Sequence, residues 1–254
     1  MNIYIVSFLV IILSQGLFFL WAYLNQSDKI TDLSYGGSFF LFVSFLFFQY
    51  SSRTTYQTIL FLMISIWAIR LAGFLYLRIQ KMGRDKRFDY IRKSAISFLG
   101  FWVMQAISII ILSLSFIRSF THVNVGDVSI ISLAGFVIWS IGMLLEVVSD
   151  YQKSQFKKLT KPPTPFIQSG LYSFVQFPNY LGEILVWIGI FIYCISSNGG
   201  AYWYTVISPL WIIFILVKFS GIPPIEKSRE EDYGGLESYQ HYIGRVRKLI
   251  PYVY

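Results

Sequence analysis

Phe177-Pro178-Asn179-Tyr180-Leu181-Gly182-Glu183 leads directly into the apolar run Ile184 to Ile195. The stretch places an amide and a carboxylate at the N-terminal end of a helix that is otherwise apolar. An ionised side chain within a membrane helix is unfavourable by at least a few kcal/mol, so it usually marks function rather than stability. We therefore interpret the run as a membrane span, and we expect Glu183 to contact a ligand.

The composition of the chain supports this interpretation. Of 254 residues, 55% are hydrophobic, 19% are aromatic and only 13% are charged, a balance that is atypical of a soluble domain. It predicts an all-α, polytopic membrane protein: a seven-helix transmembrane bundle with a cytoplasmic, amphipathic C-terminal helix. An apolar run of about 17 to 25 residues crosses a hydrocarbon core of roughly 30 Å. The predicted spans are Ile3 to Leu24, Gly36 to Tyr50, Tyr56 to Leu77, Ser94 to Ile117, Val128 to Val148, Leu181 to Ser197 and Tyr202 to Lys218.

The basic residues predict the orientation, because loops rich in Lys and Arg stay in the cytoplasm. They concentrate in Arg78 to Lys93, in Val148 to Gln168 and in the tail after Trp211, which seven spans place on one side. The N-terminus is therefore expected outside, with Ile3 to Leu24 retained as a helix, and the C-terminus in the cytoplasm. The net charge of +8 then reflects topology and attraction to anionic lipid, so nucleic acid is not required as a partner.

Residues 1–254 contain no internal repeat and are expected to form a single integral membrane domain. The first half consists mainly of long apolar runs, and polar and charged residues become more frequent after Glu146, so we expect the chemistry in the C-terminal half. Cys194 is the only cysteine, and the two histidines, His122 and His241, lie far apart on opposite predicted sides. The sequence therefore predicts no metal site.

Two groups of polar residues precede Phe177 to Glu183, which we call the Asn179 stretch. Glu146 and Asp150 are four residues apart, so they share a helix face, either as a polar ligand face or as carboxylates paired with Lys153. Lys157 and Lys158 follow, ahead of a proline-rich connector that holds them at the membrane surface. They either bind a ligand or contact lipid phosphate.

The Asn179 stretch has its own alternatives. Asn179 is expected to cap the following helix or to bind a ligand, and Gly182 to allow a close backbone approach. A carboxylate in the first turn of a helix also suits the helix dipole, which is the structural alternative for Glu183.

Two arginines are further candidates. Arg70 lies inside the third predicted span and needs an anionic or hydrogen-bonding partner, which Glu146, Asp150 or Glu183 would supply. That ion pair is either structural or catalytic. Arg229 lies in an acidic cluster of the tail, which forms either a solvated helix face or a cover over a nucleotide.

The order of these motifs resembles the steroid 5-alpha-reductase family, in its broad bacterial branch. The resemblance rests on Arg70, on Glu146-x-x-x-Asp150, on Gly170-Leu171-Tyr172, on Pro178 to Glu183, and on the tail from Glu226 to Pro251. The Asn-x-x-Gly-Glu element and the closing Ile-Pro are also shared with sterol reductases and, more loosely, with isoprenylcysteine carboxyl methyltransferases.

The resemblance implies that residues 128–254 hold NADPH from the cytoplasmic side, and that residues 1–127 form a lipid-accessible cavity for an apolar enone. The cofactor-binding residues that it implies are Glu146, Asp150, Lys157, Tyr172, Asn179, Glu183 and Arg229. Glu146 replaces the usual Asn, and Lys157 replaces the usual Arg, so a phosphate there would meet a point charge rather than a bidentate fork.

The catalytic side of the family pattern is altered. The steroid enzymes present a Gln-Glu pair from the second span and a Tyr three residues before the matching arginine. Here that arginine is Arg70, and Trp67 stands at the Tyr position, where it cannot donate a phenolic proton. Asp32, Tyr50 and Tyr56 are the nearest polar substitutes, and we take Arg70, Tyr50 and Tyr56 as the candidate catalytic residues.

Three functions follow from these observations. The first is an NADPH-dependent reductase of a carbon–carbon double bond in a lipid-soluble substrate. The second is a membrane methyltransferase that uses S-adenosylmethionine, because Arg229-Glu230-Glu231 resembles the acidic element of that branch; Phe177 occupies the position of its expected His. The third is a non-enzymatic lipid- or sterol-binding protein, which the Trp67 replacement favours.

Overall fold

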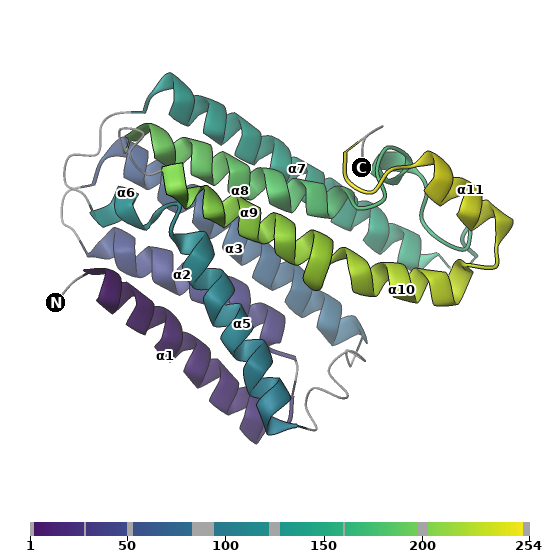
Figure 1. The fold of residues 1–254 in the computed structure, drawn as a ribbon, viewed down its shortest axis with the longest axis horizontal. Helices are drawn as coiled ribbons and strands as arrows, with labels where there is room; N and C mark the ends of the chain where they lie inside the picture. Colours follow the sequence, from purple (N-terminus) through teal and green to yellow (C-terminus); the bar gives the residue numbers. More distant parts are fainter. Residues whose placement is uncertain are drawn as a thin grey trace. The chain divides into compact units, whose positions relative to one another are not determined.

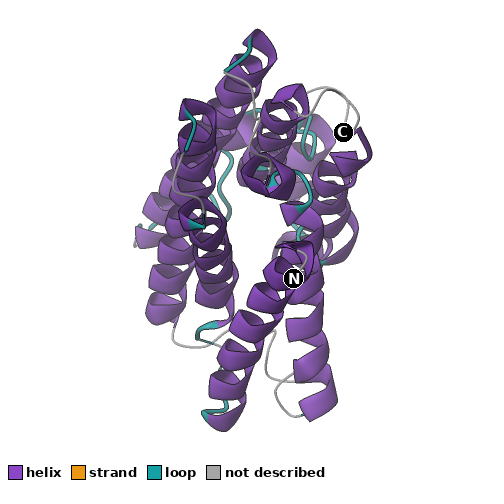
Figure 2. Cartoon of the chain, turned by 90° about the vertical axis from the view of Figure 1, so that its left-hand side faces the viewer, coloured by secondary structure: helices purple, strands orange, loops and turns teal. Residues whose placement is uncertain are grey.

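The computed structural model describes residues 3–27, 29–49, 53–82, 94–121, 128–159, 161–197 and 203–250. These residues are mostly helical, as Figures 1 and 2 show. Seven of the helical segments are long and apolar enough to cross a membrane. The prediction of an all-α, multi-pass membrane protein is confirmed. The helices of the membrane segments are α1 (Ile3–Leu24), α2 (Thr31–Phe48), α3 (Thr55–Met82), α5 (Ala95–Ser113), α7 (Ile130–Lys158), α8 (Pro178–Ser197) and α9 (Ile207–Phe214).

Several helices run beyond the apolar segments that predict them. α3 continues to Met82, so Arg78 lies within a helix and not in a loop, and α7 continues to Lys158. α8 begins at Pro178, three residues before the predicted start. Hydropathy marks only the part of a helix that lies in lipid, whereas the backbone hydrogen bonds continue into the polar ends.

The seventh segment is interrupted where one continuous run is predicted. It begins as the 3-10 turn η2 (Trp203–Val206), continues as α9, and passes into the π-helical turn η3 (Ile215–Phe219). Two short helices follow in place of one surface helix: α10 (Ile222–Tyr233) and α11 (Glu237–Arg245).

The chain divides into two compact units, which are described separately. Unit 1 comprises Met1–Leu133 and Tyr193–Ser208, and unit 2 comprises Ala134–Ile192 and Pro209–Tyr254. Unit 1 contains α1, α2, α3, α5 and the short helix α6 (Ile117–Thr121). In this unit α2 packs closely on α3, since a Cβ added at Gly36 would lie 2.6 Å from the carbonyl oxygen of Ala68.

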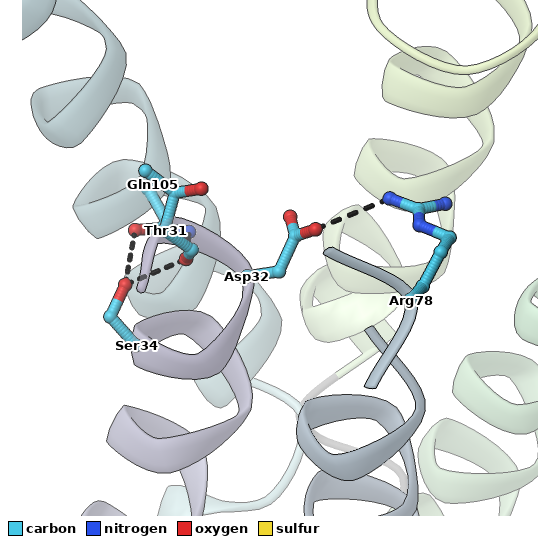
Figure 3. A network of polar contacts seen from close by, with 5 residues as sticks. All are labelled: Thr31, Asp32, Ser34, Arg78 and Gln105. Atoms are coloured by element: carbon cyan, nitrogen blue, oxygen red, sulfur yellow. Dashed lines mark hydrogen bonds and ion pairs between the residues drawn. The ribbon is translucent and has the colours of Figure 1, made fainter. Parts of the chain in front are cut away.

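A polar network ties the start of α2 to its neighbours in unit 1 (Figure 3). Arg78 of α3 pairs with Asp32 across 3.2 Å. Gln105 of α5 donates to the carbonyl oxygen of Thr31 over 2.9 Å and accepts from the hydroxyl of Ser34 over 3.2 Å. These contacts fix the beginning of α2 between α3 and α5.

The centre of unit 2 is a close contact of α7 and α8 at three glycines. A Cβ added at Gly142 would lie 2.7 Å from the carbonyl oxygen of Gly182, and one added at Gly189 would lie 2.5 Å from the backbone nitrogen of Trp139. Small residues allow membrane helices to approach this closely, and dispersion then favours their association. The contact brings the polar end of α7 beside the beginning of α8.

Candidate functional site

Glu146 lies directly against the Asn179 stretch. Its side chain is only 1% exposed, and a Cβ added at Gly182 would lie 2.7 Å from the Cγ of Glu146. The expectation of a close approach at Gly182 is thereby confirmed. Asp150 follows one turn later on α7 and is also buried. Two predicted cofactor residues therefore lie inside unit 2, beside the helix that carries two more.

Tyr172 contacts α7 at Ser149, the residue directly before Asp150. It belongs to the 3-10 turn η1 (Gly170–Ser173), and its hydroxyl donates to the carbonyl oxygen of Ser149 over 3.3 Å. Burial raises the pKa of Tyr172, the charge of Asp150 raises it further, and the charge of Arg229 lowers it. Tyr172 therefore lies within electrostatic range of both Asp150 and Arg229.

The turn before Tyr172 requires glycine. Gly170 has a φ of +64°, which side chains rarely adopt, and a Cβ there would also lie 2.6 Å from the amide of Gln152. Gln152 accepts a hydrogen bond from the backbone N–H of Leu171 over 3.0 Å. Gln152 thus fixes η1 onto α7.

Asn179 does not cap α8. The helix already includes Pro178, which suits a first helical position because proline has no N–H to satisfy. The Asn179 side chain is half-buried, and it makes no hydrogen bond with any residue that the structure describes. The capping interpretation is wrong, and the amide remains available to a ligand.

Glu183 lies one turn later on the same helix. One of its carboxylate oxygens accepts from the indole N–H of Trp187 over 3.1 Å. This bond fixes one end of the carboxylate, and each oxygen of a carboxylate can accept more than one hydrogen bond.

The two predicted cations differ in position. The guanidinium of Arg229 on α10 lies 4.8 Å from the ring centroid of Phe177, which directly precedes α8. Lys157 is exposed and lies seven residues beyond Asp150, about 10 Å further along α7. The structure therefore brings Arg229 to the Asn179 stretch. Lys157 lies further out on α7, on the helix face that carries Asp150.

The C-terminal segment holds this site together through a set of bonds that we call the clasp, between residues 172–177 and 242–248. The Gln176 side chain donates to the carbonyl oxygen of Val246 over 2.5 Å. The backbone N–H of Gln176 donates to the carbonyl oxygen of Arg247 over 2.8 Å. The backbone N–H of Phe177 donates to the carbonyl oxygen of Lys248 over 3.0 Å. Tyr242 donates to the carbonyl oxygen of Tyr172 over 2.8 Å.

Gln152, Gln176 and Tyr242 are site residues that the sequence does not single out. All three bond to backbone groups, and such partners leave no charge pattern or spacing in the sequence. The one available signal is the polar Gln176 inside an otherwise apolar approach to Phe177.

Tyr242 predicts a loss of stability at alkaline pH. Burial, opposed by the charge of Arg229, raises the pKa of Tyr242 from 10.0 to about 12. Since the folded pKa exceeds the unfolded one, this contribution to stability is fully present below about pH 10 and is lost as the pH rises through about 12. The stability of the wild type should therefore fall more steeply over this range than that of Tyr242→Phe, measured by unfolding in detergent.

Tyr151→Phe, at an exposed tyrosine, should keep the wild-type slope of stability against pH. Equal slopes for Tyr242→Phe and the wild type would contradict the prediction.

Two of the candidate catalytic residues, Arg70 and Tyr56, belong to unit 1. The guanidinium of Arg70 lies 5.7 Å from the ring centroid of Phe74 on the same helix, and Trp67 is fully buried against Phe39. Because Glu146, Asp150 and Glu183 belong to unit 2, the pairing of Arg70 with one of them stays a prediction. Tyr50 lies outside the described residues.

Tyr56 takes part in a reciprocal contact within unit 1. Its hydroxyl donates to the carbonyl oxygen of Tyr193 over 3.2 Å, and the hydroxyl of Tyr193 donates to the carbonyl oxygen of Tyr56 over 3.0 Å. The two rings stack with centroids 4.6 Å apart. These contacts explain Tyr56 as a packing residue, and its catalytic role stays a prediction.

Comparison with known proteins places these features in context. The model of the family described as "Protein of unknown function (DUF1295)" matches residues 18–246. Relatives described as "3-oxo-5-alpha-steroid 4-dehydrogenase 1" support the predicted resemblance to steroid 5-alpha-reductases. The Mus musculus protein is 24% identical over 121 residues, which are 48% of this chain and 42% of the relative. The Homo sapiens protein is 25% identical over 122 residues, again 48% and 42%.

A shorter match to the Bos taurus protein is 30% identical over 70 residues, 28% of this chain and 27% of the relative. The chain thus spans less than half the length of each of these curated relatives. No solved structure matches the chain significantly.

Proposed function

Because the chain belongs to the DUF1295 family and resembles 3-oxo-5-alpha-steroid 4-dehydrogenases, we propose that it is a membrane-embedded oxidoreductase of lipid-soluble substrates. The reaction that we propose is the NADPH-dependent reduction of a carbon–carbon double bond in an enone or steroid-like molecule. The cytoplasmic tail predicted from the basic residues would face the cellular supply of the cofactor.

The observation that carries the proposal is the gathering of polar groups around the beginning of α8. Glu146 and Asp150 are buried on α7, Tyr172 bonds to Ser149 between them in the sequence, and Glu183 follows one turn after Asn179. Each carboxylate oxygen can accept more than one hydrogen bond. Several carboxylates gathered near a phenol and an amide therefore favour a ligand rich in hydroxyl and amide donors.

The chemistry of these residues fits a dinucleotide. Carboxylates hydrogen-bond to ribose hydroxyls, which suits Glu146, Asp150 and Glu183. Arg229 would contact the phosphates as a cation, and Lys157 would reach them as a point charge at the outer end of α7. The amide of Asn179 both donates and accepts, which suits a carboxamide, and Tyr172 would donate a hydrogen bond as a neutral phenol.

On the substrate side, Arg70 would polarise the oxygen that is conjugated to the double bond. When bound, NADPH supplies the hydride that adds to one carbon of the double bond. The other carbon takes a proton, for which Tyr50 and Tyr56 are the proposed donors. The apolar helices α1, α2 and α3 would supply an environment that admits the substrate from the lipid.

Cofactor binding by the detergent-purified protein tests the proposal. NADPH, NADH and S-adenosylmethionine are titrated against the wild type and Glu183→Gln. We expect saturable NADPH binding that Glu183→Gln weakens about tenfold, because a carboxylate that accepts from a hydroxyl contributes about 1.5 kcal/mol or more.

Glu231→Gln, at an exposed carboxylate of α10, is the matched control and should bind NADPH as the wild type does. Binding of S-adenosylmethionine alone would instead indicate the methyltransferase. No binding of any of the three would favour the lipid-binding protein.

A further inference from the structure

Arg70 lies on a face of α3 that α2 contacts at both ends. Trp67, Arg70 and Arg78 share this face, because intervals of three and eleven residues are close to whole turns of a helix. The ring of Tyr35 on α2 lies edge-on to the Trp67 ring, with centroids 6.4 Å apart. At the other end of the face, Asp32 pairs with Arg78 (Figure 3). Arg70 therefore lies between these two contacts of α2.

The packing of α2 on α3 places Tyr35 at the level of Arg70. A Cβ added at Gly36 would lie 2.6 Å from the carbonyl oxygen of Ala68 and 2.8 Å from the Cβ of Ala72. Gly36 is therefore opposite the turn from Ala68 to Ala72, which contains Arg70. Tyr35 directly precedes Gly36, so the phenol and the guanidinium belong to residues at the same depth of unit 1.

The proposed reduction requires a proton donor close to the group that polarises the oxygen. In an enone, the carbon that takes the proton is bonded directly to the carbonyl carbon. A general acid must come within hydrogen-bond distance, about 2.6 to 3.2 Å, of the atom that it protonates. If Arg70 binds the carbonyl oxygen, the proton donor must therefore lie at the depth of Arg70.

Tyr56, a donor candidate from the sequence, lies far from this depth. It precedes Arg70 by 14 residues on α3, which corresponds to about 21 Å of helix. Its hydroxyl donates to the carbonyl oxygen of Tyr193 at that end of the helix. Tyr35 lies at the depth that the reaction requires.

We propose that Tyr35 is a catalytic residue that donates this proton, in place of Tyr50 and Tyr56. The inference rests on the proposed function. When hydride adds to the far carbon of the double bond, the electron pair of that bond moves to the carbonyl oxygen, where the Arg70 guanidinium stabilises the negative charge. The pair returns to the carbon–oxygen bond as the near carbon takes the phenolic proton of Tyr35. The phenolate then regains a proton from water at the beginning of α2, where the side chain of Asp32 is 28% exposed.

Turnover of progesterone, a steroid enone, tests the proposal in proteoliposomes supplied with NADPH. Tyr35→Phe keeps the ring that packs on Trp67 and Phe39 and removes only the hydroxyl. It should lower kcat about a hundredfold to ten-thousandfold, the usual contribution of a general acid, whereas KM for progesterone and the affinity for NADPH should stay close to the wild type. Tyr76→Phe, at an exposed tyrosine of α3, is the matched control and should keep the wild-type kcat.

A second measurement separates the proton donor from the cofactor. A residue that delivers a proton to a carbon also removes it in the reverse direction. The wild type should therefore exchange the hydrogens next to the ring ketone of dihydroprogesterone with deuterium from heavy water, without any cofactor, as followed by NMR. Tyr35→Phe should lose this exchange, and Tyr76→Phe should keep it.

The two measurements together distinguish the possible failures. Exchange by the wild type without oxidation of NADPH would contradict the proposed NADPH dependence and still support Tyr35 as the acid–base residue. No exchange by the wild type, or wild-type exchange or turnover by Tyr35→Phe, would overturn the assignment of Tyr35.

Discussion

Gly189→Ala is expected to destabilise the protein by about 1 to 3 kcal/mol, because the added methyl group overpacks a helix contact. The Cβ would lie 2.5 Å from the backbone nitrogen of Trp139, 2.7 Å from the carbonyl oxygen of Gly135 and 2.8 Å from the Cα of Trp139. All three are backbone atoms, so no side-chain rotation relieves the clash. α7 and α8 must separate, and the contacts between Glu146 and Gly182 weaken with them.

Thermal unfolding of the purified variants in detergent measures this effect. Gly100→Ala is the matched control, since Gly100 is also a glycine of an apolar helix but has no atom within 4 Å of its added Cβ. It should stabilise the protein slightly, by about 0.4 to 1 kcal/mol, because alanine restricts the unfolded chain. Equal unfolding temperatures for the two variants would contradict the close contact of α7 and α8.

Gln176→Leu is expected to reduce both stability and cofactor binding. Its side chain is 4% exposed, and the substitution leaves the buried carbonyl oxygen of Val246 without its donor. An unsatisfied buried acceptor destabilises by about 1 to 3 kcal/mol. Because Gln176 directly precedes Phe177 and the first turn of α8, we expect the loosened clasp to weaken NADPH binding as well.

Gln240→Leu provides the control for this substitution. Gln240 also donates to a backbone carbonyl oxygen, that of Gly234 over 2.9 Å, but it is exposed and outside the clasp. Water replaces that bond when the side chain is lost, so stability and NADPH affinity should stay close to the wild type. If Gln176→Leu unfolds at a lower temperature yet binds NADPH normally, the clasp supports the fold and does not position the site.

The sequence predicts the membrane segments well because length and apolarity are local properties. α1 begins and ends at the predicted residues, whereas α7 extends ten residues past Val148. Hydropathy falls where α7 leaves the lipid, but its hydrogen bonds continue. The π-helical turn at Ile215–Phe219 has no signal of this kind, since it continues the apolar run of α9 as far as Lys218.

The candidate site is predictable in part. A glycine before a carboxylate indicates a close approach, and the structure has Glu146 against Gly182. The error at Asn179 arises from preferring an Asn cap over proline at the first helical position, although both rules apply to the same stretch. The clasp could not be predicted in this way, because Phe177 and Lys248 meet through backbone groups that every residue possesses.

The clasp also sets an order of events during synthesis. Val246 follows Gln176 by 70 residues, so at about 5 to 20 residues per second the ribosome adds it some 4 to 14 seconds later. During that interval α8 and the seventh segment enter the membrane while the groups of Gln176 that bond to residues 246 and 247 still lack their partners. The Asn179 stretch is therefore completed only when residues 242–248 fold back onto it, and a nascent protein truncated before residue 242 would be inserted in the membrane but not yet assembled at its site.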